Sequence, residues 1–253
     1  MNKYVSNELE NYLKIHMKSF ECPAHDIEHV YRVANLAIKI AAQEKLRNEY
    51  DIDMKCVYIA GLVHDVLDTK LIDENESNSI EENLIKILTT YGNDEQRLND
   101  TETRKVISII KDVGYKNLLC PNFNPQQKSI EYKIVQDSDL LDAIGAVGIA
   151  RCLAFSGRMK RSLFGGIDAD PDKENITQQQ YKDQQKKNIG SSVQHFFDKL
   201  LKIKSMMLTS YGRELAIERH DFMKKFLIQI DEELIETDYN EGGNIKKRIK
   251  LSN

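Results

Sequence analysis

Apolar residues recur at intervals of three or four along almost the whole chain. A first stripe of this kind joins Val5, Leu9, Leu13 and Met17. Further stripes lie within residues 30–40, 57–64, 84–88, 106–110, 134–155, 193–207 and 215–234. This spacing places apolar side chains on one face of a helix. Alternating strand patterns flanked by turn pairs are nearly absent, so the sequence predicts an all-α fold.

Polar stretches at residues 73–79, 119–128 and 156–180 interrupt the stripes. None has the length and low complexity of a linker between independent domains. We therefore expect one helical-bundle domain over residues 21–236, with additional C-terminal helices and long functional loops. A helix within residues 1–20 would pack on its core. Residues 237–253 would form a polar tail, whose basic run Lys246–Lys250 we expect to be solvated.

The composition supports a globular protein and excludes several functional classes. The 253 residues are 41% apolar and 30% charged, which is typical of a folded domain with a sizeable core. No apolar run approaches the roughly 20 residues that cross a bilayer, and the N-terminus lacks a signal-peptide pattern. A net charge of −4 argues against a broad nucleic-acid surface. Four widely spaced cysteines indicate reduced thiols, so we expect a cytoplasmic protein without membrane or nucleic-acid partners.

Histidine–aspartate pairs occur three times, at His25-Asp26, His64-Asp65 and His220-Asp221. The dipeptide alone decides nothing. His64-Asp65 follows the apolar run of residues 57–63, where burial of an ionisable pair is costly unless the pair binds a partner or a cation. His29 lies on the apolar side of its helix. Taken singly, His29 fits a hydrogen-bonded core histidine, and His64-Asp65 fits a charged helix end.

Acidic residues at 137, 139 and 142 precede another apolar helix. Alone they fit a helix start that favours negative charge. Asp139 and Asp142 share a helical face at a spacing of three. A set of two histidines and two aspartates would leave coordination positions for water, and it suits Mn²⁺, Fe²⁺, Co²⁺ or Mg²⁺ better than a closed structural zinc.

The order H…HD…D resembles that of the HD-domain metal-dependent phosphohydrolases. The resemblance runs through "AHDIEHVYRV", "AGLVHDVLDTK" and "VQDSDLLDAIGAVGIARCLAF", and includes "VQHFFDKLLKIKSMM" and "ERHDFMKKFL". It covers residues 20–230 and is similar to a bacterial and eukaryotic subgroup whose characterised bacterial members are nucleotide pyrophosphohydrolases. The motifs are specific for the superfamily and much less specific for the substrate.

The resemblance implies that His29, His64, Asp65 and Asp139 ligate one divalent metal ion. Manganese is our first expectation, with magnesium, cobalt, iron or nickel as alternatives. Asp137 stays a second choice for the last ligand, because Leu140 replaces the basic residue of the family's usual D-[KR]-L sequence. Two-metal relatives need extra histidines between the HD pair and the last aspartate, and this chain has none there. The site would therefore hold a single metal.

Catalytic and substrate-binding roles also follow from the resemblance. Asp68 occupies the position of a catalytic acid, and Lys70 follows it as a catalytic and phosphate-binding candidate, although these residues also fit a solvated turn. Substrate contacts are expected from His25, Arg32, Asp142 and Arg151. Arginine matches phosphate oxygens with its planar fork, but Arg32 and Arg151 also fit surface helix positions. His220-Asp221 is interpreted as an outer-face coincidence.

Together these features predict a hydrolase that converts a (deoxy)nucleoside triphosphate into a monophosphate and pyrophosphate. A nucleoside 5′-monophosphatase with the same metal site is the alternative enzyme. A metal-stabilised interaction protein without turnover is the alternative from another class. The expected partner is a small phosphorylated substrate, with a possible homodimer.

Overall fold

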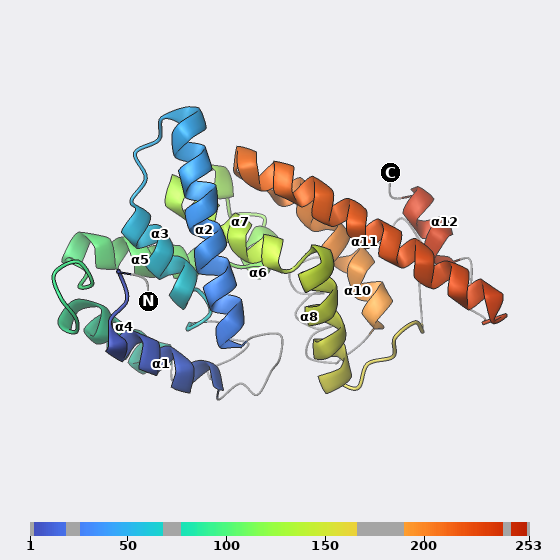
Figure 1. Ribbon diagram of the computed structural model, residues 1–253, viewed down its shortest axis with the longest axis horizontal. Coiled ribbons are helices and arrows are strands. Elements are labelled where there is room, and N and C mark those ends of the chain that lie inside the picture. The colour runs from blue at the N-terminus through green and yellow to red at the C-terminus, as the bar shows by residue number, and fades with distance from the viewer. Residues whose placement is uncertain (1–2, 19–25, 68–76, 166–189, 240–243, 252–253) are drawn as a thin grey trace. The chain divides into compact units, whose positions relative to one another are not determined.

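The computed structural model describes residues 3–18, 26–67, 77–165, 190–239 and 244–251 (Figure 1). These residues form α-helices and short 3-10 helices without a strand, which confirms the all-α fold. The chain divides into two compact units. One comprises Met1–Gly114 and Pro125–Asp139, and the other comprises Tyr115–Asn124 and Leu140–Asn253. The domain boundaries at residues 20, 21 and 236 stay predictions.

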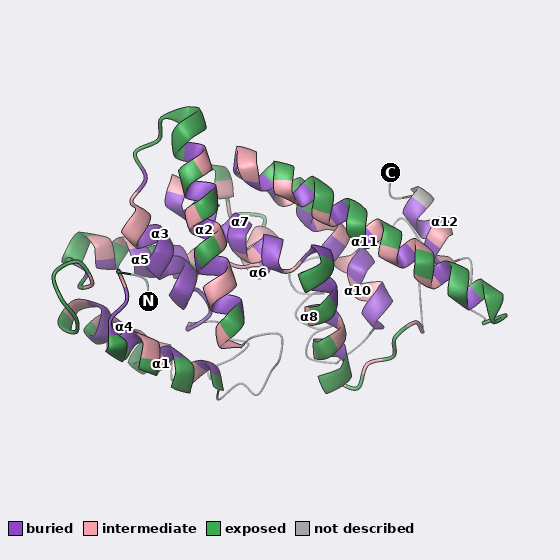
Figure 2. Cartoon of the chain, viewed as in Figure 1, coloured by how far each residue is buried: buried purple, intermediate pink, exposed green. Residues whose placement is uncertain are grey.

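The first unit contains the helices that carry the candidate site. They are α1 (Asn7–Lys18), α2 (Ile27–Asn48), α3 (Met54–Val63), α4 (Ser77–Thr90), α5 (Asp100–Asp112), η1 (Pro125–Gln127) and most of α7 (Ile130–Asp142). Helix α3 is its centre, because every residue from Cys56 to Val63 is buried. A helix that is apolar all round must be enclosed on every side. Helices α2 and α5 both pack against α3. Figure 2 colours most of α3 as buried.

Gly61 explains how closely α2 approaches α3. A Cβ atom at this position would lie 3.0 Å from the Cα of Ala34. Such a contact is between a side chain and backbone, so neither helix can relieve it by changing a rotamer. The absence of a side chain therefore sets the spacing of the two helices. His29 lies at the start of α2 and His64 directly follows α3, so the same spacing brings the two histidines together.

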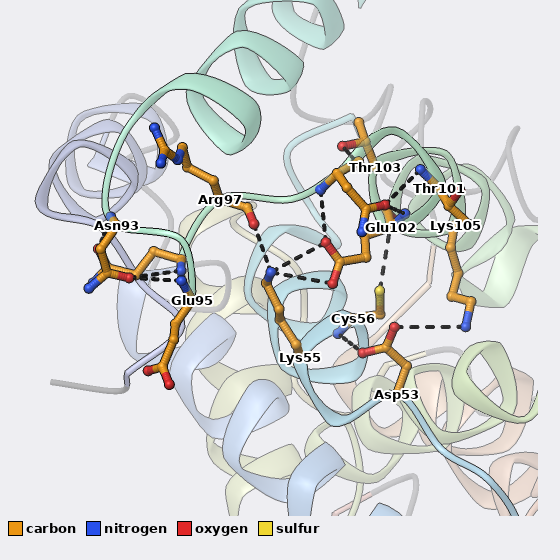
Figure 3. A network of polar contacts seen from close by, with 12 residues as sticks. Asp53, Lys55, Cys56, Asn93, Glu95, Arg97, Thr101, Glu102, Thr103 and Lys105 are labelled. Atoms are coloured by element: carbon orange, nitrogen blue, oxygen red, sulfur yellow. Dashed lines mark hydrogen bonds and ion pairs between the residues drawn. The ribbon is translucent and has the colours of Figure 1, made fainter.

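A polar network fixes the N-terminal end of α3 against α5 (Figure 3). The Asp53 side chain caps α3 by accepting a hydrogen bond from the Cys56 backbone N–H at 2.9 Å. Lys55 Nζ donates to the Arg97 carbonyl at 2.7 Å and to the Glu102 carboxylate at 3.3 Å. Caps of this kind typically stabilise a helix by about 1 kcal/mol. The network thus holds the start of α3 in register against α5.

The second unit is built around the long helix α11 (Ser210–Glu236). Its other elements are α6 (Tyr115–Leu118), α8 (Gly145–Arg158), α10 (Ser192–Asp198), η3 (Leu200–Met206) and α12 (Asn244–Leu251). Helix α11 contacts α8, η3 and α12. Thr209 caps its first turn by accepting a hydrogen bond from Gly212 N at 3.0 Å.

The buried face of α11 differs from our expectation. We assigned His220 to the outer face of the helix that carries the apolar stripe within residues 215–234. His220 is buried, and the apolar Phe222 in that range is 50% exposed. The buried positions follow Ala216, His220, Met223 and Leu227, so the inward stripe is displaced by about one residue. Because burial disfavours the charged imidazole, the pKa of His220 is lowered, with the nearby charges of Lys204 and Lys224 acting in the same direction.

The expectation of a solvated C-terminal tail is also wrong for residues 244–251, which form α12. Both oxygens of buried Asp231 accept hydrogen bonds from the backbone N–H groups of Ile245 and Lys246, at 3.2 and 3.3 Å. Arg248 is buried, donates to Gln194 Oε1 at 2.8 Å and stacks over the Phe197 ring at 4.4 Å. The basic run Lys246–Lys250 therefore belongs to an amphipathic helix, whose buried apolar residues are Ile245 and Ile249.

Two smaller expectations concern cysteines and membrane spans. Cys56, Cys120 and Cys152 are free thiols, as expected, and burial raises the pKa of Cys152 to about 11. Among the described residues, no single helix has the length and apolar character to cross a bilayer. The bent pair of α7 and α8 meets those criteria only when the two helices are taken together.

Candidate metal centre

His29 is held at the first turn of α2 by a helix cap. The Asp26 side chain accepts a hydrogen bond from the His29 backbone N–H at 2.9 Å. This bond satisfies one of the N–H groups that a helix start leaves without an intrahelical partner. The cap fixes the His29 backbone, and its side chain is 1% exposed. Asp26, the acid of the His25-Asp26 pair in the sequence, therefore acts as the N-cap of α2.

His64 directly follows α3. Its ring is oriented by a hydrogen bond on the side away from the cluster. Nδ1 lies 2.8 Å from the carbonyl oxygen of Gly61. A carbonyl only accepts, so Nδ1 carries the proton in this contact, and the lone pair of a neutral ring is on Nε2. Nε2 is buried and has no hydrogen-bond partner among the described residues. This is how a metal-ligating histidine is usually arranged.

Two carboxylates face the two imidazoles. Asp65 Oδ2 lies 3.4 Å from His29 Nε2, and Asp65 Oδ1 lies 3.3 Å from His64 Nε2. Asp139 Oδ1, from α7, lies 3.7 Å from His29 Nε2 and 3.6 Å from His64 Nε2. The imidazole planes meet edge-on, at 77° with centroids 5.0 Å apart. The structure thus brings together four side chains from three separate segments.

The two carboxylates dominate the electrostatics of the cluster. Burial alone would lower the pKa of His64, but the charges of Asp65 and Asp139 raise it to about 9. Burial would likewise raise the pKa of Asp139, and the neighbouring imidazole of His64 lowers it. The site therefore favours positive charge. A metal ion supplies that charge and displaces the imidazole proton, so its binding would release a proton.

The arrangement fits a divalent cation. With both imidazoles neutral, the four side chains carry two negative charges, which one divalent ion would balance. Ligand atoms about 2.0–2.2 Å from one ion lie roughly 3.0–3.5 Å from each other at octahedral or tetrahedral angles. The observed separations of 3.3–3.7 Å are close to this range. Ligand atoms of His29, His64 and Asp139 all lie within 4.8 Å of one another. Asp137, the second choice, does not belong to that group of three, and neither does Asp65, which joins the cluster through its contacts of 3.4 and 3.3 Å with the two imidazoles.

The other expected substrate residues lie in different settings. Arg32, on α2, is one turn beyond His29 and lies 3.9 Å from the Glu28 carboxylate, which is exposed. Asp142 and Arg151 bind each other at 3.0 Å. His25, Asp68 and Lys70 lie outside the described residues. No sequence pattern pointed to Arg219, whose Nη1 donates to the Leu141 carbonyl at the end of α7.

Comparison with known proteins places these features in a family. The HD-domain family model matches residues 26–144, a range that contains all four clustered side chains. The uncharacterized protein YpgQ of Bacillus subtilis is 36% identical over 214 residues, covering 85% of this chain and 86% of its own. The crystal structure of YpgQ in complex with ADP superposes with a TM-score of 0.62 and 32% identity, covering 88% of this chain and 97% of that chain.

Two further solved structures agree. A protein from Lactobacillus plantarum gives a TM-score of 0.68 at 26% identity and covers 92% of this chain and 99% of that chain. An HD-superfamily hydrolase from Bacillus thuringiensis gives a TM-score of 0.57 at 28% identity and covers 88% and 95% respectively. The family match, the shared length and the histidine–aspartate cluster agree, and the chain belongs to the HD-domain superfamily of metal-dependent phosphohydrolases.

Proposed function

We propose that the protein hydrolyses nucleoside triphosphates to monophosphates and pyrophosphate, with His29, His64, Asp65 and Asp139 as ligands of a single divalent ion. The observation that supports this most strongly is the buried group of two imidazoles and two carboxylates, at mutual distances suited to one cation. Nucleotide binding by YpgQ, which was crystallised with ADP, supports the choice of substrate.

A divalent ion held by these ligands would activate a water molecule and polarise a phosphoryl oxygen near neutral pH. In the proposed reaction, water attacks the α-phosphorus, the bond from that phosphorus to the bridging oxygen breaks, and pyrophosphate leaves. Gly61 contributes by accepting the Nδ1–H of His64, which keeps the other ring nitrogen available. Asp68 would transfer protons at the reacting centre.

Charge on the substrate would be met by basic residues. Arg32 shares a face of α2 with His29 at a spacing of three residues, and its guanidinium lies 3.9 Å from the exposed Glu28 carboxylate. An exposed ion pair of this kind contributes less than about 1 kcal/mol, so a phosphate can compete with Glu28 for the guanidinium. We propose the same role for Lys70, with His25 and the Asp142–Arg151 pair as further substrate contacts.

The test is a nucleotide panel assayed with Mn²⁺, Mg²⁺ and Co²⁺, in which pyrophosphate and orthophosphate are measured separately. We expect pyrophosphate and a nucleoside monophosphate in equal amounts from triphosphates. Asp65→Ala should abolish this release, whereas Asp94→Ala is a matched control because the Asp94 side chain is 95% exposed. Orthophosphate from monophosphates alone would support a monophosphatase and contradict the proposal. Metal binding without turnover of any nucleotide would contradict it in favour of a non-catalytic protein.

A further inference from the structure

The last turn of α7 has an unfavourable charge distribution. It contains Asp139 and Asp142 and no basic residue. The C-terminal end of a helix carries a partial negative charge, so acids there are destabilising, whereas basic side chains are favourable. The helix ends in a 3-10-type turn, in which Ala143 N and Ile144 N donate to the carbonyls of Leu140 and Leu141, at 3.2 and 3.3 Å. A metal-ligand candidate thus lies in a turn that its own sequence does not stabilise.

Two arginines compensate from other helices. Arg151, on α8, pairs with Asp142 at 3.0 Å. Arg219, on α11, donates from Nη1 to the Leu141 carbonyl, which gives this carbonyl at the helix end a second donor beside Ile144 N. Burial lowers the pKa of Arg219, and the charge of Asp142 opposes that effect. Arg219 therefore provides at the end of α7 the basic side chain that the helix lacks.

The absence of a side chain at Gly145 leaves the space that the Arg219 side chain occupies. The φ of Gly145 is +75°, a left-handed conformation that glycine adopts without strain. A Cβ atom there would lie 2.9 Å from Cγ and 3.0 Å from Cβ of Arg219. The arginine stem consequently packs on the bare backbone of the turn between α7 and α8. Stem and guanidinium together hold the chain immediately after the last turn of α7.

We propose that Arg219 is a positioning residue for the metal centre, which acts by fixing the last turn of α7 and hence the carboxylate of Asp139. Leu141, which accepts its hydrogen bond, is two residues beyond Asp139 in the same helix. This inference rests on the proposed role of Asp139 as a ligand. Loss of outer partners that orient metal ligands typically weakens metal binding by about 10- to 100-fold. We expect an effect near the lower end, because Arg151 remains in place.

Arg213→Gln provides a matched control for Arg219→Gln. Arg213 also lies on α11, and its Nη1 also donates to a backbone carbonyl, that of Met207, at 3.0 Å. Both variants lose one charge and one arginine–carbonyl bond from the same helix. A second pair tests the glycine. Gly145→Ala adds strain and a contact with Arg219, whereas Gly190→Ala adds strain at φ +97° with the nearest atom at 3.8 Å.

The experiment is calorimetric titration of each metal-free variant with Mn²⁺, combined with amide hydrogen exchange of residues 139–144. Arg219→Gln should weaken Mn²⁺ binding about tenfold and speed exchange at Ala143 and Ile144. Gly145→Ala should act in the same direction and non-additively with Arg219→Gln. Arg219→Lys should recover part of the affinity, and both control variants should bind Mn²⁺ as the wild type does.

Asp139→Asn, titrated in parallel, separates this inference from the proposed function. If Asp139→Asn binds Mn²⁺ normally, both the ligand assignment and the positioning role are wrong. If Asp139→Asn loses Mn²⁺ while Arg219→Gln binds it like Arg213→Gln, the ligand assignment stands and the positioning role alone is overturned.

Discussion

Two polar clusters lie in the first unit, and they differ in the kind of cation that faces their carboxylates. In one, the buried carboxylate of Glu131 lies 3.0 Å from Lys105 Nζ, with Asp53 at 3.9 Å from the same nitrogen. A lysine is charged at any physiological pH. In the other, Asp65 and Asp139 face His29 and His64, and an imidazole is cationic only when protonated. Burial of charge is common to both clusters, so burial alone does not identify a functional site.

The difference lies in what completes the cluster. In the Lys105 cluster, a permanently charged side chain of the chain itself faces the carboxylates and ties α3, α5 and α7 together. The histidine cluster carries two negative charges when its rings are deprotonated, and it then needs an added cation. The first arrangement stabilises the fold, whereas the second is suited to chemistry. A substitution in one cluster should therefore leave the other intact.

The largest effect is expected at the histidine cluster. Asp65→Ala should lose both bound metal and hydrolysis, with a rate at least about 100-fold lower, because a direct ligand contributes more than the outer partners that orient it. Asp68→Ala should keep the metal and lose rate only. Metal content by elemental analysis and the turnover rate distinguish the two variants. A stoichiometric metal in Asp65→Ala would show that the ligand set is wrong.

A smaller effect is expected at the lysine cluster. Glu131→Gln leaves Lys105 with only the distant Asp53 carboxylate, and we expect a loss of about 1–2 kcal/mol in the free energy of unfolding, since Lys105 is one-third exposed and partly solvated. Mn²⁺ affinity should be unchanged. Urea unfolding measures the first quantity and calorimetry the second. If Glu131→Gln is as stable as the wild type, the Lys105–Glu131 pair does not stabilise the fold.

The same cluster predicts a dependence on pH. Burial would raise the pKa of Glu131, but the hydrogen bond and charge of Lys105 together with nearby donors lower it below 4.5. A carboxyl whose folded pKa is lowered stabilises the protein above its unfolded pKa, and the contribution is lost as pH falls through the folded value. The stability difference between wild type and Glu131→Gln should therefore be constant above about pH 5 and should shrink on further acidification. A difference that grows with acid would contradict this assignment.

Much of the fold follows from the sequence, and the exceptions have local causes. The apolar stripes located α1 and α3, whose buried residues are apolar, and α2, whose buried face is apolar between His29 and Glu44. The stripe of α11 was misplaced, since its inward face includes His220 and Asp231. Helix α12 was missed because its basic residues outnumber Ile245 and Ile249, and Arg248 is buried by stacking rather than by hydrophobicity.

The candidate site shows a similar limit. The resemblance to the HD-domain family implied a ligand set of His29, His64, Asp65 and Asp139, and the structure places these side chains together. The sequence could not reveal the Gly61 carbonyl behind His64 or the contact between Arg219 and Leu141. Both depend on helix ends and on packing between distant segments, which leave no periodic pattern.

The most direct test of the account is the number of divalent ions bound per chain. Metal-free protein titrated with Mn²⁺ should bind one ion per chain, and His64→Gln should bind none at the same concentrations. The Glu131→Gln variant, which alters the other cluster, should still bind one. Two ions per chain in the wild type, or one ion retained by His64→Gln, would contradict a single-metal centre built on these four side chains.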